Sequence, residues 1–222
     1  PSSVTTIGGG AFASCTSLTE VTIGNSVETI EYLAFAICTS VTEFSVDAGN
    51  TNYSSDDKGV LFNKNQTDLI QYPVGNTRNT YTIPISVTTI GERAFYNCTS
   101  LTEVTIGNLV EYIGVEAFVF CTSLTEVTIP VSVKTIGFFA FAGCTALALV
   151  KWDTTNITTI PTGTFTECSA VSDPTNFRVN NVMSNIVFGP ENGDFSNRSV
   201  VGGGLKFGDD NVPEDGFKTV KV

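Results

Sequence analysis

A unit of 23 residues recurs along the chain and keeps its spacing over long stretches. Near-identical copies begin at Leu18, Leu101 and Leu124. The cysteines share one position in the unit: Cys15, Cys38, Cys98, Cys121, Cys144 and Cys168. A unit this short cannot bury an apolar face alone, so neighbouring units must stack on one another. The repeat therefore predicts a solenoid in which each coil holds one unit.

The order of residues within a unit predicts a mainly β coil. In the stretch LTEVTI, Leu18, Val21 and Ile23 alternate with Glu20 and Thr22, which is typical of a half-buried strand in a parallel sheet. The stretch SVxTIG predicts a second short strand that ends in a turn, and AFxxCxS predicts a tight turn or 3₁₀ segment with Phe and Cys inward. Like residues of successive coils then stack at about 4.8 Å.

The repeat also divides the chain into segments. Regular coils are predicted over residues 1–168, with an insertion of 37 residues between Cys38 and Cys98 that occupies about 47–80. Within it, Val60–Phe62 and Leu69–Tyr72 predict a hairpin across a polar loop. Residues 169–216 lose the consensus and predict an irregular β region or cap, and residues 217–222 predict one more strand.

Composition excludes several kinds of function. The formal net charge is −11, which disfavours nucleic-acid binding because that binding depends on Lys and Arg at the phosphates. The chain has no histidine, so it lacks the base of a serine-protease triad and the commonest zinc ligand. No apolar run is long enough to span a bilayer. We expect no enzyme, no cofactor, no metal site and no membrane insertion, and we interpret Asp56-Asp57 and Asp209-Asp210 as ordinary turns.

The cysteines are expected to be buried free thiols. Cysteines at one repeat position lie a full coil apart, farther than the Cβ separation of about 3.8 Å that a disulfide needs. One or more bridges remain the alternative, since an even number of cysteines in a secreted chain favours disulfides.

Two rows of polar residues are expected on the exposed face of the LTEVTI strands, and they form a candidate binding face. The rows contain Glu20, Glu43, Glu103 and Glu126, followed two residues later by Thr22, Ser45, Thr105 and Thr128. Their functional interpretation is a ligand surface, and the alternative is an ordinary solvated strand face. Stacked carboxylates repel one another, so water, cations or a basic partner must compensate them.

The pattern Asn-x-Ser/Thr marks candidate glycosylation sites at Asn52, Asn65, Asn97, Asn156 and Asn197. Modification is expected only if the source is a eukaryote.

The two ends of the sequence predict head-to-tail assembly. The chain starts without Met at Pro1, in the middle of a unit, so we expect a processed or excised piece. The last six residues, FKTVKV, share the apolar pattern of LTEVTI. The strand with Phe217, Val220 and Val222 would complete the first coil of a following unit, against an acceptor formed by Pro1, Val4, Ile7 and Phe12. The alternative is a C-terminal cap.

The units resemble the BspA-like leucine-rich repeats, whose pattern is LxxVTIPxSVTxIGxxAFxxCxSL, from residue 1 to about 168. The insertion, Phe44–Pro73, looks like the long repeat variant of that family. The resemblance implies an extracellular or cell-surface protein that binds proteins or adheres and does not catalyse. Two hypotheses follow: a structural protein whose units assemble with one another into a filament, or an adhesin or receptor-type module that recognises host or cell-surface proteins through its sheet face.

Overall fold

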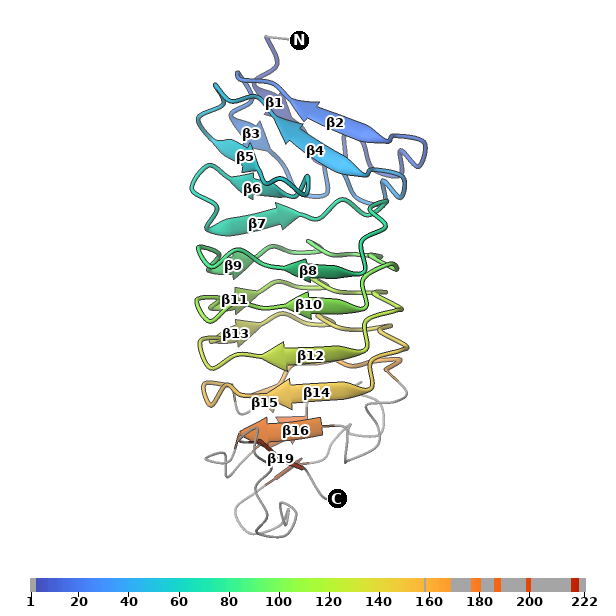
Figure 1. Cartoon of the computed structure of the whole chain (residues 1–222), viewed down its shortest axis with the longest axis vertical. Coiled ribbons are helices and arrows are strands. Elements are labelled where there is room, and N and C mark those ends of the chain that lie inside the picture. The colour runs from blue at the N-terminus through green and yellow to red at the C-terminus, as the bar shows by residue number, and fades with distance from the viewer. Residues whose placement is uncertain are drawn as a thin grey trace.

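The computed structural model describes residues 3–157 and 159–168, together with four strands at 177–180, 186–188, 199–200 and 217–219. The described residues contain strands and turns and no helix. Coils are stacked along one long axis, with the N-terminal coils at one end and the C-terminal strands at the other (Figure 1). The predicted β solenoid is confirmed.

The LTEVTI stretches form the strands on one side of the coils, which we call the first sheet although the insertion divides its hydrogen bonding into two parts. In β2, Val21 and Ile23 are buried while Glu20 and Thr22 are exposed, which confirms the predicted alternation. Successive strands pair parallel and in register, so Val127 faces Val150. The strands are β2 (Glu20–Ile23), β4 (Glu43–Val46), β8 (Thr80–Thr82), β10 (Glu103–Thr105), β12 (Glu126–Ile129) and β14 (Leu149–Trp152).

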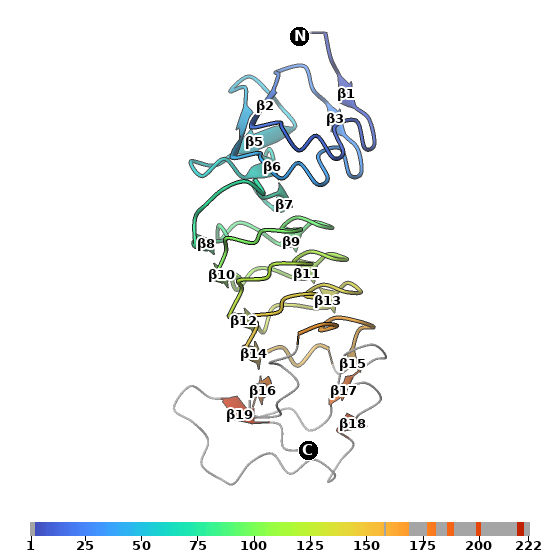
Figure 2. The ribbon, with the colours of Figure 1, turned by 90° about the vertical axis from the view of Figure 1, so that its right-hand side faces the viewer.

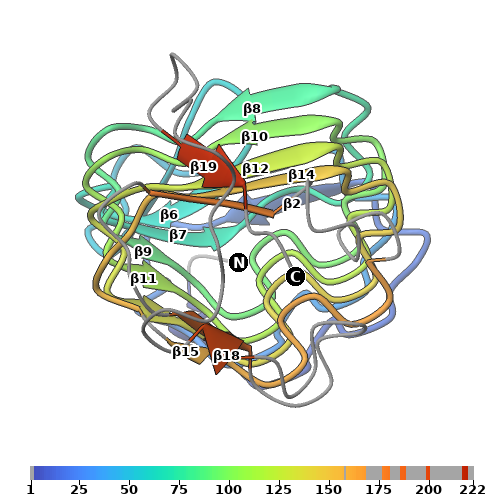
Figure 3. The same ribbon diagram turned by 90° about the horizontal axis from the view of Figure 1, so that it is seen from below.

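The SVxTIG stretches form two-residue strands on another side of the coils (Figures 2 and 3), which we call the second sheet although its hydrogen bonding is divided into three parts. They are β1 (Thr6–Ile7), β3 (Thr29–Ile30), β9 (Thr89–Ile90), β11 (Tyr112–Ile113), β13 (Thr135–Ile136) and β15 (Thr159–Ile160). We number the coils by these strands, and each coil includes the turn that follows its strand. Coil 1 contains β1, coil 2 contains β3, coil 3 holds the insertion, and coils 4 to 7 contain β9, β11, β13 and β15 in that order.

The AFxxC stretch closes each regular coil as a tight turn, as predicted, and its Phe rings stack between coils. Phe118 lies 4.7 Å from Phe95 and 5.0 Å from Phe141, measured between ring centroids. Each turn contains two residues with positive φ, and most of these are not glycine; in coil 2 they are Leu33 and Ile37. Left-handed backbone costs about 1–2 kcal/mol at such residues, so the turn depends on contacts with its neighbours.

Hydrogen bonds between backbones join successive turns. In coil 4 the N–H groups of Arg93, Phe95 and Asn97 donate to carbonyls of coil 5 at 3.0, 2.8 and 2.8 Å. Coils 1, 5 and 6 donate to the next turn through the three equivalent N–H groups. We call this series the turn ladder.

All six cysteines are free thiols, and five are buried, as predicted. The thiol of Cys121 donates to the carbonyl of Phe95 at 3.1 Å, and the thiols of Cys38, Cys144 and Cys168 donate to the equivalent Phe carbonyls. Burial raises the pKa of Cys121 to about 12. Cys15 differs because no described coil covers its outer side, and it is exposed.

The insertion contains the predicted hairpin and one strand that the sequence pattern did not indicate. Strands β6 (Leu61–Asn63) and β7 (Asp68–Gln71) pair antiparallel, and β5 (Tyr53–Ser55) adds to β6. Strand β7 also pairs parallel with β9, so it occupies the place of coil 3 in the second sheet. The chain then passes through Tyr72 to Asn76 directly to β8, and coil 3 has no AFxxC turn.

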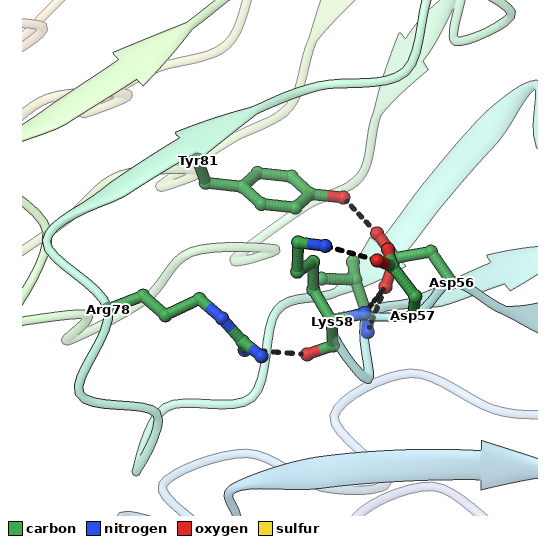
Figure 4. Close-up of polar contacts among 6 residues, drawn as sticks. Asp56, Asp57, Lys58, Arg78 and Tyr81 are labelled. Carbon is green, nitrogen blue, oxygen red and sulfur yellow. Dashed lines mark hydrogen bonds and ion pairs between the residues drawn. The ribbon is translucent and has the colours of Figure 1, made fainter.

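The turn at Asp56 fastens the insertion to coil 4 (Figure 4). One carboxylate oxygen of Asp56 accepts the N–H groups of Lys58 and Val60, both at 2.9 Å, and the other accepts the Tyr81 hydroxyl at 2.7 Å. Arg78 donates to the Lys58 carbonyl, and Lys58 pairs with Asp57. These bonds match the ordinary turn chemistry expected there.

Parallel pairing continues beyond Cys168, where the repeat consensus ends. Strand β16 (Phe177–Asn180) follows β14 in the first sheet, and β17 (Ile186–Phe188) follows β15 in the second. Strands β18 (Ser199–Val200) and β19 (Phe217–Thr219) then pair antiparallel with β17 and β16.

Candidate protein-binding face

The predicted Glu and Thr rows lie on the exposed side of the first sheet. Glu20 stands opposite Glu43, and Glu103 stands opposite Glu126. Every member of the two rows is exposed except Glu126, which is half-buried. In-register parallel pairing is the reason, because it places equivalent residues of neighbouring coils side by side.

The rows are not continuous, which corrects the expectation of a single face. Strands β4 and β8 belong to separate sheets, and β4 is inclined to the strands below it (Figure 1). The Asp56 turn covers the edge of β4, where the Phe44 N–H donates to the Gly59 carbonyl at 2.9 Å. In coil 4 the place of Glu is taken by Thr80, which stands opposite Glu103. The insertion therefore separates Glu20 and Glu43 from Glu103 and Glu126.

The second part of the face is hollowed into an open groove of about 520 Å³ over β10 and β12. Glu103, Thr105, Glu126 and Thr128 line it with neighbouring threonines. Lys151 donates to Glu126 at 2.6 Å, whereas the carboxylate of Glu103 has no partner among the described residues. We call this region the acidic groove, since it presents one unpaired carboxylate and two free hydroxyl groups to solvent.

The predicted acceptor end lies beside a hollow of about 300 Å³ that Val4, Ile7 and Phe12 line. Phe12 is 40% exposed and stacks on Phe35 at 5.4 Å. Pro1 lies outside the described residues, as do Val220 and Val222. Phe217 begins β19, whose described pairing is antiparallel to β16 of the same chain, whereas the sequence overlay expects a parallel strand.

The glycosylation motifs differ in accessibility. Asn52 and Asn65 are exposed, and Asn97 is half-buried in a turn. Asn156 is exposed, but its amide nitrogen already donates to the carbonyls of Val131 and Val133 at 3.0 and 3.2 Å. Asn197 lies outside the described residues. Modification at any of them stays a prediction.

Sequence reasoning did not find the surface beside the missing turn of coil 3. There Arg93 places its guanidinium 6.0 Å from the ring centre of Tyr32 and 5.8 Å from that of Tyr96. Arg93 also donates to Glu116 at 2.5 Å. The available signal was the absence of an AFxxC stretch after Leu69–Tyr72, which shows that one coil lacks its turn.

Within the described part of the chain, no three His, Cys, Asp or Glu side chains gather in a way that could hold a metal ion. The same residues include no helix with the length and hydropathy of a membrane-spanning segment.

Comparison with known proteins places these repeats in a family. The model described as "BspA type Leucine rich repeat region" matches in 6 copies over residues 1–78 and 75–188. No curated protein matches the sequence significantly. Three solved bacterial structures are similar to the chain.

A leucine-rich repeat protein from Eubacterium ventriosum is 31% identical with a TM-score of 0.67, over 77% of this chain and 45% of its own. A leucine-rich cell surface protein from Faecalibacterium prausnitzii is 25% identical with a TM-score of 0.66, over 90% and 56%. The pneumococcal vaccine antigen PcpA is 25% identical with a TM-score of 0.54, over 65% and 41%.

The chain thus spans about half the length of the solved proteins that it matches. The repeat pattern, the stacked parallel coils and the family match over most of the sequence agree with one another. The chain belongs to the BspA-type leucine-rich repeat family.

Proposed function

We propose that this chain is a non-catalytic binding module of a bacterial cell-surface protein, and that it recognises a basic protein surface through the acidic groove. The observation that carries the proposal is the Glu103 carboxylate, which has no partner among the described residues and lies beside exposed Thr105 and Thr128 on an in-register sheet. A cell-surface protein and a pneumococcal antigen among the similar structures support the location.

The shape of the groove favours binding over catalysis. Both carboxylates lie on an open face, without the enclosed cleft in which paired carboxylates usually catalyse. Exposed charges of one sign steer an oppositely charged partner and fix its orientation. A protein surface with Lys or Arg and hydrogen-bond donors complements Glu103 and the two hydroxyl groups.

Binding to a panel of purified surface and matrix proteins, from acidic to basic, tests this proposal by biolayer interferometry. We expect binding of basic members that weakens as salt rises, and a loss of about tenfold or more in the double variant Glu103→Lys, Glu126→Lys. Glu111→Lys is the matched control, because Glu111 is exposed on the second sheet and pairs there with Lys134. Equal binding by the double variant and the wild type contradicts the proposal.

Head-to-tail assembly into a filament is the second candidate function. It is favoured by the apolar hollow beside Val4, Ile7 and Phe12, which a strand with inward apolar residues would fill. Negative-stain imaging tests it: filaments that disappear when Phe217–Val222 is deleted support it, and dispersed short rods before deletion refute it. Replacement of the exposed Phe12 by Glu at the hollow should have the same effect as the deletion.

A further inference from the structure

The turn ladder is interrupted at coil 3, and the interruption leaves backbone groups without partners. The N–H groups of Leu33, Phe35 and Ile37 in coil 2 occupy the positions that donate to the next turn in coils 1, 4, 5 and 6. Coil 3 has no AFxxC turn, so within the described chain these three N–H groups meet no acceptor.

The edge of coil 4 that faces coil 2 has the opposite gap, carbonyl groups without donors. In the regular ladder, carbonyls such as those of Tyr32, Ala34 and Ala36 accept from the preceding turn. Among the described residues, only the Ala94 carbonyl of the equivalent carbonyls in coil 4 accepts, from the Tyr72 N–H at 2.7 Å and from the Gln71 side-chain amide at 3.4 Å. The carbonyls of Glu92 and Tyr96 receive no donor from the described residues.

A cleft of about 510 Å³ lies between these two edges, and we call it the notch. Its lining includes Leu33, Phe35 and Ile37 from coil 2 and Glu92, Arg93 and Tyr96 from coil 4. Phe35 is 4% exposed, so its unpaired N–H is withdrawn from bulk water. A buried backbone group without a partner costs free energy comparable to a lost hydrogen bond, and a ligand that satisfies it recovers that energy.

We propose that the notch binds an extended peptide segment of a partner protein, which takes the place of the missing turn of coil 3. The three N–H groups of coil 2 require carbonyls on one side of the segment, and the Glu92 and Tyr96 carbonyls require N–H groups on its other side. The two open edges thus define one strand-like occupant, held mainly through its backbone.

The side chains around the notch specify a basic segment with apolar neighbours. Asp68 and Glu92 lie in the lining, while the one Arg there, Arg93, already pairs with Glu116. Glu31 also lines the notch, but its carboxylate is turned toward coil 1, where it accepts the Gly9 N–H at 2.7 Å. The side chains of Tyr32 and Ile37, which are 57% and 43% exposed, form an apolar surface in the lining. A Lys or Arg of the segment meets this excess of carboxylates, and apolar residues on either side of it cover Tyr32 and Ile37.

The notch lies on the turn side of the coils and shares no lining residue with the acidic groove. A variant can therefore lose binding at the notch and keep binding at the acidic groove, or the reverse.

The test uses the full chain and a short, end-blocked peptide of alternating Val and Lys as the probe. Binding is measured by titration, and hydrogen exchange of single amides is measured by NMR. At saturation we expect exchange at Leu33, Phe35 and Ile37 to slow by about tenfold or more, while the amides of Phe95 and Phe118 stay unchanged. A peptide of Val and Glu, and a Val-Lys peptide with methylated backbone nitrogens, should not bind.

Ala36→Trp should fill the notch and weaken the peptide by about tenfold or more, because Ala36 lies in the lining. The matched control is Ala13→Trp, the equivalent exposed position in coil 1, which should leave binding unchanged. Glu92→Lys should also weaken the peptide, whereas Glu103→Lys in the acidic groove should not, and this contrast separates failure here from failure of the proposed function.

Three results would overturn the proposal. The first is equal affinity of the Ala36→Trp and Ala13→Trp variants for the peptide. The second is slow exchange at Leu33, Phe35 and Ile37 without any peptide, which would mean that the chain's own residues fill the notch. The third is a concentration-dependent dimer that Ala36→Trp abolishes, which would identify the occupant as a second copy.

Discussion

Replacement of Gly137 by Ala tests how closely the coils are packed. A Cβ at Gly137 would stand 2.3 Å from the Val115 nitrogen and 2.5 Å from its Cα, both atoms of the adjacent coil. Ordinary contact begins at 3.4 Å, so the two coils must separate by about 1 Å at this point. The obstructing atoms are backbone, so no side chain can rotate away.

The cost follows from the bonds that such a displacement breaks. Gly137 donates to the Ile113 carbonyl at 2.8 Å, and Glu116 donates to the Phe138 carbonyl at 3.0 Å. Stretching either bond by about 1 Å takes it beyond hydrogen-bond range, at about 1 kcal/mol each. With an overpacking cost of about 1–3 kcal/mol, we expect Gly137→Ala to lower the free energy of unfolding by about 3–5 kcal/mol.

The same substitution at Gly107 is the matched control, since a Cβ there would meet only the Ile83 carbonyl oxygen, at 3.8 Å. Gly107→Ala should stabilise the protein slightly, by about 0.4–1 kcal/mol, because alanine restricts the unfolded chain. Urea unfolding followed by the fluorescence of Trp152, the one tryptophan and fully buried in β14, measures both variants. Unfolding free energies within about 0.5 kcal/mol of each other would refute the reasoning.

Four further predictions concern the thiols, the stacked rings and the insertion. Burial raises the pKa of Cys121 to about 12, above its unfolded value, so the stability that this thiol contributes should be constant below about pH 9 and fall between about pH 9 and 12 as the unfolded state loses its proton. Cys121→Ser should make that fall smaller in urea titrations at stepped pH, and part of it should remain because burial also raises the pKa of Cys98, and a hydrogen bond with Cys168 together with burial raises the pKa of Cys144. In the native protein a thiol reagent should modify Cys15 rapidly and the five buried cysteines only after unfolding, and equal rates would contradict their burial. Phe118 is stacked between two rings, so Phe118→Leu should lower the free energy of unfolding by about 1–3 kcal/mol, and Phe12→Leu, which removes one stacked pair, by less than half of that. Asp56→Ala removes three hydrogen bonds at the insertion and should lower it by about 2–4 kcal/mol. Urea unfolding measures all three variants.

Much of the fold could be predicted from the order of residues because each repeat unit packs against the units that precede and follow it in the sequence. Val21 and Glu20 take opposite sides of a strand through backbone geometry alone, and a constant period stacks each residue on its equivalent. The hairpin of the insertion was predictable for the same local reason, since β6 and β7 are joined by a short polar loop.

The turn conformation was predictable only in outline. Its left-handed residues include Leu33, Glu116 and Phe120, which have no local preference for positive φ. In coils 4, 5 and 6 they are held by hydrogen bonds to the next coil, so the conformation is a property of the stack and not of the AFxxC stretch by itself.

The sequence by itself determined the solenoid, its parallel in-register strands, the buried thiols and the two rows of Glu and Thr, because each follows from a period that repeats unchanged. Only the tertiary structure decided how the insertion interrupts that period. Asp56 joins its turn to Tyr81 of coil 4, and Tyr72 leads directly to β8. This path of the insertion divides the candidate binding face, and it also leaves the notch open between Ile37 and Tyr96.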